Sequence, residues 1–166
     1  MQITKKISDL IFSVEKIIVN ILSIVMLGSI SLGVFFRFVL NNPLSWSDEL
    51  AIYTLVWITF IGGSMGVKTQ QAASLTIVFD RLNIKSQKIV LIIAHGIVTA
   101  FSIFVFYLAL KWISGPSVSK TVSPALGITM FYPYLGVPVG LLFLTIHSFD
   151  HFIQSFRYKG EKKEEN

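Results

Sequence analysis

Residues 17–36, with the sequence IIVNILSIVMLGSISLGVFF, form a run of 20 residues without a charged side chain. At about 1.5 Å per helical residue this run reaches about 30 Å, the thickness of the hydrocarbon core of a bilayer. Three further uncharged windows are long enough to cross: 50–67 with 18 residues, 89–110 with 22 and 121–149 with 29. The sequence therefore predicts an all-α integral membrane protein with four transmembrane helices.

The composition agrees with this prediction. Of 166 residues, 53% are hydrophobic and 14% charged, whereas about a quarter are charged in an ordinary soluble domain. We place the spans at about 17–37, 48–67, 88–111 and 126–149 in a single domain, followed by a charged cytoplasmic tail at 157–166. The stretches between spans are too short for a soluble domain with its own core, which excludes a soluble catalytic or substrate-binding globule.

The absence of cysteine and the distribution of charge exclude further kinds of site and partner. The chain has no cysteine, so disulfides, thiolate metal sites and cysteine nucleophiles are excluded. Its net charge is +5. The basic residues sit at the predicted membrane boundaries, where they set topology and meet anionic membrane lipid, so the charge does not indicate a nucleic-acid partner.

The basic residues also predict the orientation. Eleven lie on the side of the termini and the loop between spans two and three: Lys5, Lys6, Lys16, Lys68, Arg81, Lys85, Lys88, Arg157, Lys159, Lys162 and Lys163. Three lie on the other side: Arg37, Lys111 and Lys120. The positive-inside rule therefore predicts that both termini and the middle loop are cytoplasmic.

Short amphipathic segments flank the spans. Before span one, apolar residues recur at helical spacing opposite charged ones: Ile3, Ile7, Leu10, Ile11, Val14 and Ile18 against Lys5, Lys6, Asp9 and Lys16. This pattern fits either a separate helix lying at the cytoplasmic interface or an extension of span one into the cytosol. A second interfacial helix is predicted after span two, from Leu75, Val78, Phe79 and Leu82. Turn-forming residues predict no regular structure at about 114–124.

The outer turn at 37–49, RFVLNNPLSWSDE, holds the strongest candidate residues. Asp48 and Glu49 fall in the first turn of span two, where the helix dipole favours carboxylates. Steps of three and four residues place six side chains on one helical face: Trp46, Glu49, Tyr53, Trp57, Phe60 and Ser64. Glu49 at the membrane edge needs a partner, and we predict an ion pair with Arg37, the only cation nearby in sequence.

Three interpretations of this face remain open. It is either an ion pair with an interfacial aromatic belt, or a docking face for a partner protein, or a site of proton or ion coupling through Glu49. Coupling has the least support, because a residue at the end of a span is wet.

Glycines and histidines add weaker signals. Gly62 with Gly66 and Gly136 with Gly140 have the small-xxx-small spacing of close helix contacts, within this chain or with a partner. His95 and His147 lie in spans three and four without an accompanying carboxylate cluster, which favours hydrogen-bonded packing histidines over a metal site. The windows also offer neither a ring of charge for a pore nor a catalytic cluster.

Two motifs together resemble a known family. The core NNPLSWSDE at 41–49, followed by Tyr53, Trp57 and Gly62-Gly63, resembles the signature of the small membrane subunit of tripartite ATP-independent periplasmic (TRAP) transporters, the DctQ-like or Q subunit. The stretch SPALGI at 123–128, running into YPYLGVPVG at 132–140, is similar to the last span of that family. One departure is Ser74, which stands where the family often has a histidine.

This resemblance implies a non-enzymatic scaffold in a sodium-driven symport system for organic acids in the bacterial inner membrane. The expected partners are a large M-type membrane subunit, which carries the substrate and sodium sites, and a periplasmic P-type substrate-binding protein. No cofactor is expected in this chain, and the large subunit is expected to be a separate chain. The closing motif resembles that of sialic-acid members. The alternative function is a stand-alone small membrane channel or carrier.

Overall fold

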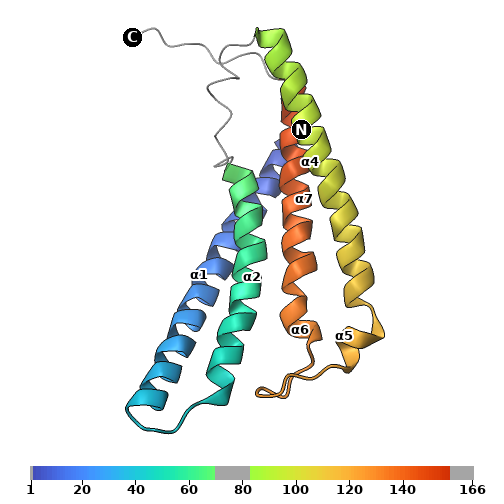
Figure 1. Cartoon of the computed structure of the whole chain (residues 1–166). Coiled ribbons are helices and arrows are strands. Elements are labelled where there is room, and N and C mark those ends of the chain that lie inside the picture. Colours follow the sequence, from blue (N-terminus) through green and yellow to red (C-terminus); the bar gives the residue numbers. More distant parts are fainter. Residues whose placement is uncertain (1, 70–82, 158–166) are drawn as a thin grey trace, which may run out of the picture.

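A computed structural model describes residues 2–69 and 83–157 of the chain, in which every regular element is a helix (Figure 1). The elements are α1 (Gln2–Phe38), α2 (Ser45–Thr69), α4 (Ile84–Ile113), α5 (Pro116–Lys120), α6 (Phe131–Tyr134) and α7 (Gly136–Ser155). Four segments are long and apolar enough to cross a membrane: Ile3–Phe38, Ser45–Thr69, Ile84–Ile113 and Phe131–Ser155. The predicted four-helix membrane protein is confirmed.

The first span is much longer than the hydrocarbon core. Helix α1 runs without a break from Gln2 to Phe38, about 55 Å at 1.5 Å per residue. Of the two alternatives for the N-terminal segment, the structure therefore has the extension of span one. The predicted interfacial helix at Leu75–Leu82 and most of the charged tail at 157–166 lie outside the described residues.

The fourth span begins later than the sequence suggests. Residues 126–130, which the sequence assigned to the span, belong to a tight turn in which Val122 bridges Thr129 and Ser123 N–H donates to Ile128 O at 2.8 Å. Gly127 closes this turn with φ of 66°, a left-handed conformation that glycine adopts without steric cost. Helix α5 also provides one short turn of helix within 114–124, where none was expected.

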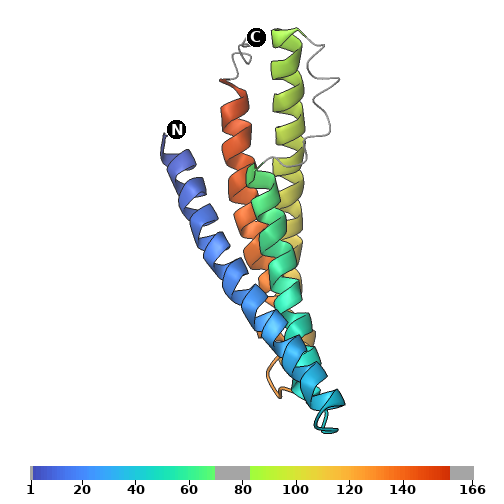
Figure 2. The same ribbon diagram turned by 90° about the vertical axis from the view of Figure 1, so that its left-hand side faces the viewer.

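The four long helices form a row. Helix α1 packs on α2, α2 packs on α7, and α7 packs on α4, in the order seen across Figure 1. Seen from the side, α1 leans away from the other helices toward its N-terminal end (Figure 2). We call the end where α1 begins and α7 ends the inner end, and the end with the α1–α2 turn and α5 the outer end.

The interior of the row is polar and the outside apolar. Only five hydrophobic side chains are buried among the described residues: Ala51, Ile61, Ala109, Ile113 and Val118. Fourteen described polar or charged residues are buried, and most of them are serines or threonines. This inversion is typical of membrane proteins, because lipid covers the apolar surface and small polar residues let the helices approach.

The orientation of the bundle gives a first prediction. Ser117 at the outer end and Ser86 at the inner end are both exposed, and the cysteine-free chain allows single-cysteine labelling. In intact spheroplasts, an impermeant maleimide should label Ser117→Cys and not Ser86→Cys, because the positive-inside rule places Ser117 in the periplasm. Both variants should react after permeabilisation. Labelling of Ser86→Cys alone in intact spheroplasts would reverse the orientation.

Candidate functional site

Glu49 ties the outer end of α2 to the loop that precedes α6. Its Oε1 accepts a hydrogen bond from the Tyr53 hydroxyl at 2.5 Å, and its Oε2 accepts from the backbone N–H groups of Ala125 and Leu126, each at 3.0 Å. The Tyr53 hydroxyl also lies 3.1 Å from Met130 Sδ. One carboxylate therefore satisfies two backbone donors of a loop that lies 76 and 77 positions further along the chain.

The predicted ion pair between Arg37 and Glu49 is wrong. Arg37 Nη2 instead lies 2.7 Å from Asp48 Oδ2, and both side chains are more than half exposed. Successive residues of a helix point about 100° apart, so Asp48 faces the end of α1 while Glu49 faces the loop. Sequence proximity identified the right cation and the wrong one of two adjacent acids.

The aromatic face of α2 packs against this chain's own fourth span. Trp57 Nε1 donates to Tyr132 O at 3.3 Å. A Cβ added to Gly136 would lie 2.8 Å from the Trp57 ring, and one added to Gly140 would lie 2.6 Å from the Phe60 backbone. Gly136 and Gly140 therefore provide a close approach of α2 and α7.

The glycines of α2 have no such neighbour. A Cβ added to Gly62, Gly63 or Gly66 would meet nothing within 4 Å. Trp46 is half-buried at the start of α2. The candidate residues thus divide: Glu49, Tyr53, Trp57, Gly136 and Gly140 contact this chain, whereas Arg37 and Asp48 are exposed and the α2 glycines face open space.

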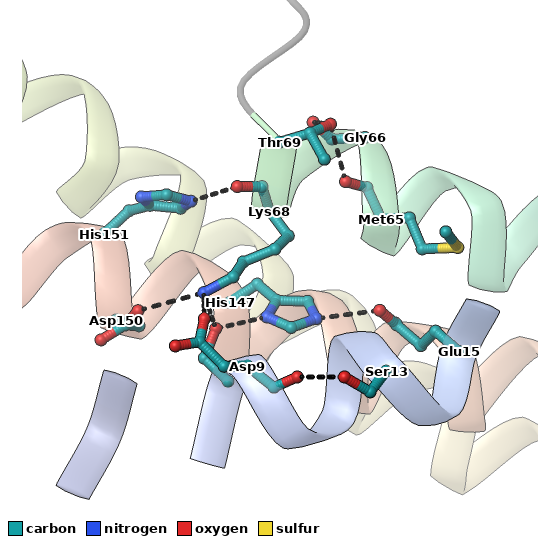
Figure 3. A network of polar contacts seen from close by, with 11 residues as sticks. Asp9, Ser13, Glu15, Met65, Gly66, Lys68, Thr69, His147, Asp150 and His151 are labelled. Carbon is teal, nitrogen blue, oxygen red and sulfur yellow. Dashed lines mark hydrogen bonds and ion pairs between the residues drawn. The ribbon is translucent and has the colours of Figure 1, made fainter. Parts of the chain in front are cut away.

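At the inner end, Lys68 lies between α1 and α7 (Figure 3). Its Nζ lies 2.8 Å from Asp9 Oδ1 and 3.7 Å from Asp150 Oδ2, and donates to Ser8 Oγ at 2.7 Å. The side chain of Lys68 is 13% exposed and that of Asp150 2%. One largely buried cation therefore lies beside a buried carboxylate of α7 and also contacts α1.

His147 is fully buried and bridges two turns of α1. Its Nδ1 lies 2.7 Å from Ser8 Oγ and its Nε2 3.0 Å from Glu15 Oε2. Because Ser8 accepts from Lys68, its own hydroxyl can donate to Nδ1, and a proton on Nε2 can then donate to Glu15. The expectation that His147 is a hydrogen-bonded packing residue is confirmed.

The other two histidines, His95 and His151, join α4 to α7. His95 Nδ1 lies 2.7 Å from Ser155 Oγ, and the His95 ring stacks on the His151 ring with centroids 5.6 Å apart. His151 Nε2 lies 3.3 Å from Lys68 O at the end of α2. Together with the contacts of Lys68 and His147, the inner end connects all four long helices.

We call the following residues the inner cluster: Ser8, Asp9, Glu15, Lys68, His147, Asp150 and His151. The sequence did not predict it, because the spans were placed at about 17–37 and 126–149, which leaves Glu15, Asp150 and His151 outside them. The sequence did contain a signal for this cluster. The same predicted membrane boundary is marked by charged residues of three spans, so these residues lie at one depth: Glu15, Lys16, Lys68 and Asp150.

The described contacts of these sites join helices of this chain to one another. Among residues 2–69 and 83–157, no group of three or more histidine or acidic side chains is arranged to hold a metal ion. Two buried carboxylate oxygens of the inner cluster, Glu15 Oε1 and Asp150 Oδ1, have no hydrogen-bond partner in this part of the chain. A buried carboxylate destabilises the fold strongly when it loses its charged or hydrogen-bonded partner. The position of α1 therefore depends on the few residues of the inner cluster.

Comparison with known proteins assigns the family. Residues 26–158 match the family described as tripartite ATP-independent periplasmic transporters, DctQ component. The chain is similar to the isethionate TRAP transporter permease protein DctMQ of Oleidesulfovibrio alaskensis, with 29% identity over 94 residues, which are 57% of this chain and 15% of the relative.

Two further relatives are small subunits by name. The C4-dicarboxylate TRAP transporter small permease protein DctQ of Rhodobacter capsulatus is 25% identical over 97 residues, 58% of this chain and 43% of the relative. The ectoine TRAP transporter small permease protein TeaB of Halomonas elongata is 24% identical over 136 residues, 82% of this chain and 70% of the relative. The match thus covers less than half the length of DctMQ and of DctQ.

The outer contacts give a second prediction. Arg37→Gln and Asp48→Asn should each change the free energy of unfolding by about 0–1 kcal/mol, because their ion pair is exposed. Glu49→Ala should lower the thermal midpoint in detergent further, because it removes the acceptor of the Ala125 N–H and leaves the Leu126 N–H with Ser123 Oγ alone. Glu49→Gln, which keeps a carbonyl acceptor, should fall between. An Arg37→Gln effect as large as that of Glu49→Ala would contradict this assignment.

The inner cluster gives a third prediction. His147→Leu should destabilise the bundle by about 3–5 kcal/mol, because it leaves the Glu15 carboxylate buried and unpaired. The double variant Glu15→Leu/His147→Leu should recover much of this loss, since both buried polar partners are then absent. Unfolding by denaturant in detergent measures both. Ser13→Ala, on the exposed side of α1, is the control. If the effects of Glu15→Leu alone and His147→Leu alone add up to that of the double variant, the result counts against a direct Glu15–His147 contact.

Proposed function

Because the chain belongs to the DctQ component family of tripartite ATP-independent periplasmic transporters, we propose that it is the small permease subunit of a sodium-coupled uptake system for an organic acid. The family is a transporter component and not an enzyme. Four helices able to cross a membrane make the chain a multi-pass membrane protein. We propose that it lies in the bacterial inner membrane and acts there as a fixed scaffold for the large transport subunit.

The observation that carries the scaffold proposal concerns the hydrogen bonds of three buried hydroxyl groups within the spans, those of Thr54, Thr99 and Ser102. Thr54 donates to Leu50 O and Ala51 O, Thr99 donates to His95 O, and Ser102 donates to Thr99 O. These groups bond to carbonyls of their own helix, so they are occupied within the helix. A carrier needs polar groups that face a shared cavity at membrane depth, whereas each of these three hydroxyls donates to its own helix.

The partner proposal follows from the relatives. One relative is named as a DctMQ permease, and the matched region is 15% of its length. That name combines M and Q in one protein, which supports a large M-type subunit as the partner of this chain. We propose that the exposed outer pair Arg37 and Asp48, with half-buried Trp46, helps to dock the periplasmic substrate-binding protein.

We propose that the substrate site lies in the large subunit and not in this chain. The three relatives are named for isethionate, C4-dicarboxylate and ectoine. We propose an organic acid, with sialic acid as the first compound to assay because of the closing motif at 132–140. Sodium is proposed to bind in the large subunit. The second candidate function is a stand-alone channel or small carrier.

Purification and calorimetry test the scaffold. Co-expressed with the large membrane subunit and purified in mild detergent, the chain should form a stable equimolar complex. The isolated chain should give no heat of binding with sodium or sialic acid in titration calorimetry, whereas its deletion should abolish uptake by the whole system. Specific binding to the isolated chain, or a homo-oligomer that transports alone, would refute the scaffold and favour the channel.

A further inference from the structure

An apolar stripe runs along the exposed side of α1. Every large hydrophobic residue that is exposed between positions 3 and 24 belongs to one series with alternating steps of four and three. Its members are 43% to 72% exposed: Ile3, Ile7, Leu10, Val14, Ile17, Ile21 and Ile24. We call this series the α1 stripe. Steps of this kind give a period of 3.5 residues, the repeat by which one helix packs along another.

The rest of the exposed surface of this part of α1 is polar. The other exposed residues between positions 3 and 24 are Lys5, Lys6, Asp9, Ser13, Lys16 and Asn20. The segment therefore has one side suited to water and one suited to an apolar neighbour. A helix surrounded by lipid would not need this division.

Lipid tails do not account for the first half of the stripe. The uncharged window 17–36 already reaches about 30 Å, the full hydrocarbon thickness. Ile3, Ile7, Leu10 and Val14 precede this window and Lys16. They continue the stripe for about three more turns at the inner end.

The inner cluster also keeps this segment from lying flat on the membrane. Ser8 and Glu15 both contact His147 of α7, and Asp9 contacts Lys68 of α2. These contacts hold residues 8–15 alongside the ends of two membrane-spanning helices. An amphipathic helix that binds the interface by its apolar face must lie in the membrane plane, and this continuous helix follows the span.

We propose that the α1 stripe is the surface on which an apolar helix of the large membrane subunit packs. This inference rests on the proposed function, which names the large membrane subunit as the partner. It adds which surface of this chain that partner contacts. Residues 3–24 offer about 32 Å of seam, which extends from inside the bilayer past its inner boundary. The inner cluster acts as the positioning device that presents the seam at a fixed angle.

Cysteine accessibility tests the seam in reconstituted membranes. Leu10, 68% exposed, is replaced in Leu10→Cys, and Lys5 on the polar side is replaced in the control Lys5→Cys. Both variants are placed in phosphatidylethanolamine–phosphatidylglycerol vesicles, alone and in complex with the large subunit, and treated with a membrane-permeant maleimide. Leu10→Cys should react at least about tenfold more slowly in the complex than alone, whereas Lys5→Cys should react at the same rate in both samples.

Each other outcome has a definite meaning. Equal, fast reaction of Leu10→Cys in both samples means that no partner covers the stripe, and equal, slow reaction means that lipid covers it; either result overturns the proposal. If no complex with the large subunit forms at all, the proposed function itself fails. A complex that forms while Leu10→Cys stays reactive refutes only the seam.

A matched pair of double variants gives an independent measurement. Ile7→Ala/Leu10→Ala truncates two exposed residues of the α1 stripe, and Ile93→Ala/Ile97→Ala truncates two exposed residues of α4 at a similar spacing. The amount of large subunit that co-purifies should fall several-fold with the α1 pair and stay unchanged with the α4 pair. An equal effect of both pairs, or none from the α1 pair, would contradict a seam on α1.

Discussion

Helices in a bilayer gain little by burying apolar side chains against one another, because lipid tails are as apolar as leucine. In this chain the contacts between helices are therefore made by buried polar groups and by small residues. Lys68 is the clearest example of a polar group that joins helices, since its ammonium group contacts Ser8 and Asp9 of α1 and Asp150 of α7. Without this cation, the buried Asp150 would lose its charged neighbour, and α1 would lose one of its attachments to the bundle.

The outer half of the bundle uses a different principle. Gly136 and Gly140 let α7 approach the Trp57 ring and the Phe60 backbone of α2 more closely than any side chain would allow. Glu49 then fixes the loop before α6 through two backbone N–H groups. Helix α2 thus contacts α1 on one side and α7 on the other.

This arrangement suits a subunit that supports another protein. The long helices lie side by side in a row (Figure 1), whereas a channel needs helices arranged around a pore. The charged side chains with contacts between helices lie at the two ends, where Arg37 contacts Asp48 and Lys68 contacts Asp9 and Asp150. The exposed surface is mostly apolar, and on α1 it is organised as a helix-packing stripe that continues beyond the uncharged window.

Residues at the two ends show the limits of sequence reasoning about the site. Arg37 was correctly identified as an ion-pair partner at the outer turn, but Asp48 and Glu49 are adjacent and only their rotation about the α2 axis decides which of them it meets. Glu15 lies before the predicted first span at about 17–37, so the sequence indicated no partner for it. The structure buries it, since His147 arrives from the other end of the chain.

The sequence by itself determined that there are four spans, which residues lie near each membrane boundary, and the family to which the motifs belong. It could do so because the bilayer has a fixed thickness, so hydropathy and charge along the chain report depth directly. Only the tertiary structure decided that the helices form a row, that α2 and α7 meet at glycines, and that Ser8, Lys68 and His147 share one cluster. Those facts depend on how each helix is rotated and beside which helix it lies, and this is set by contacts between segments far apart in the chain.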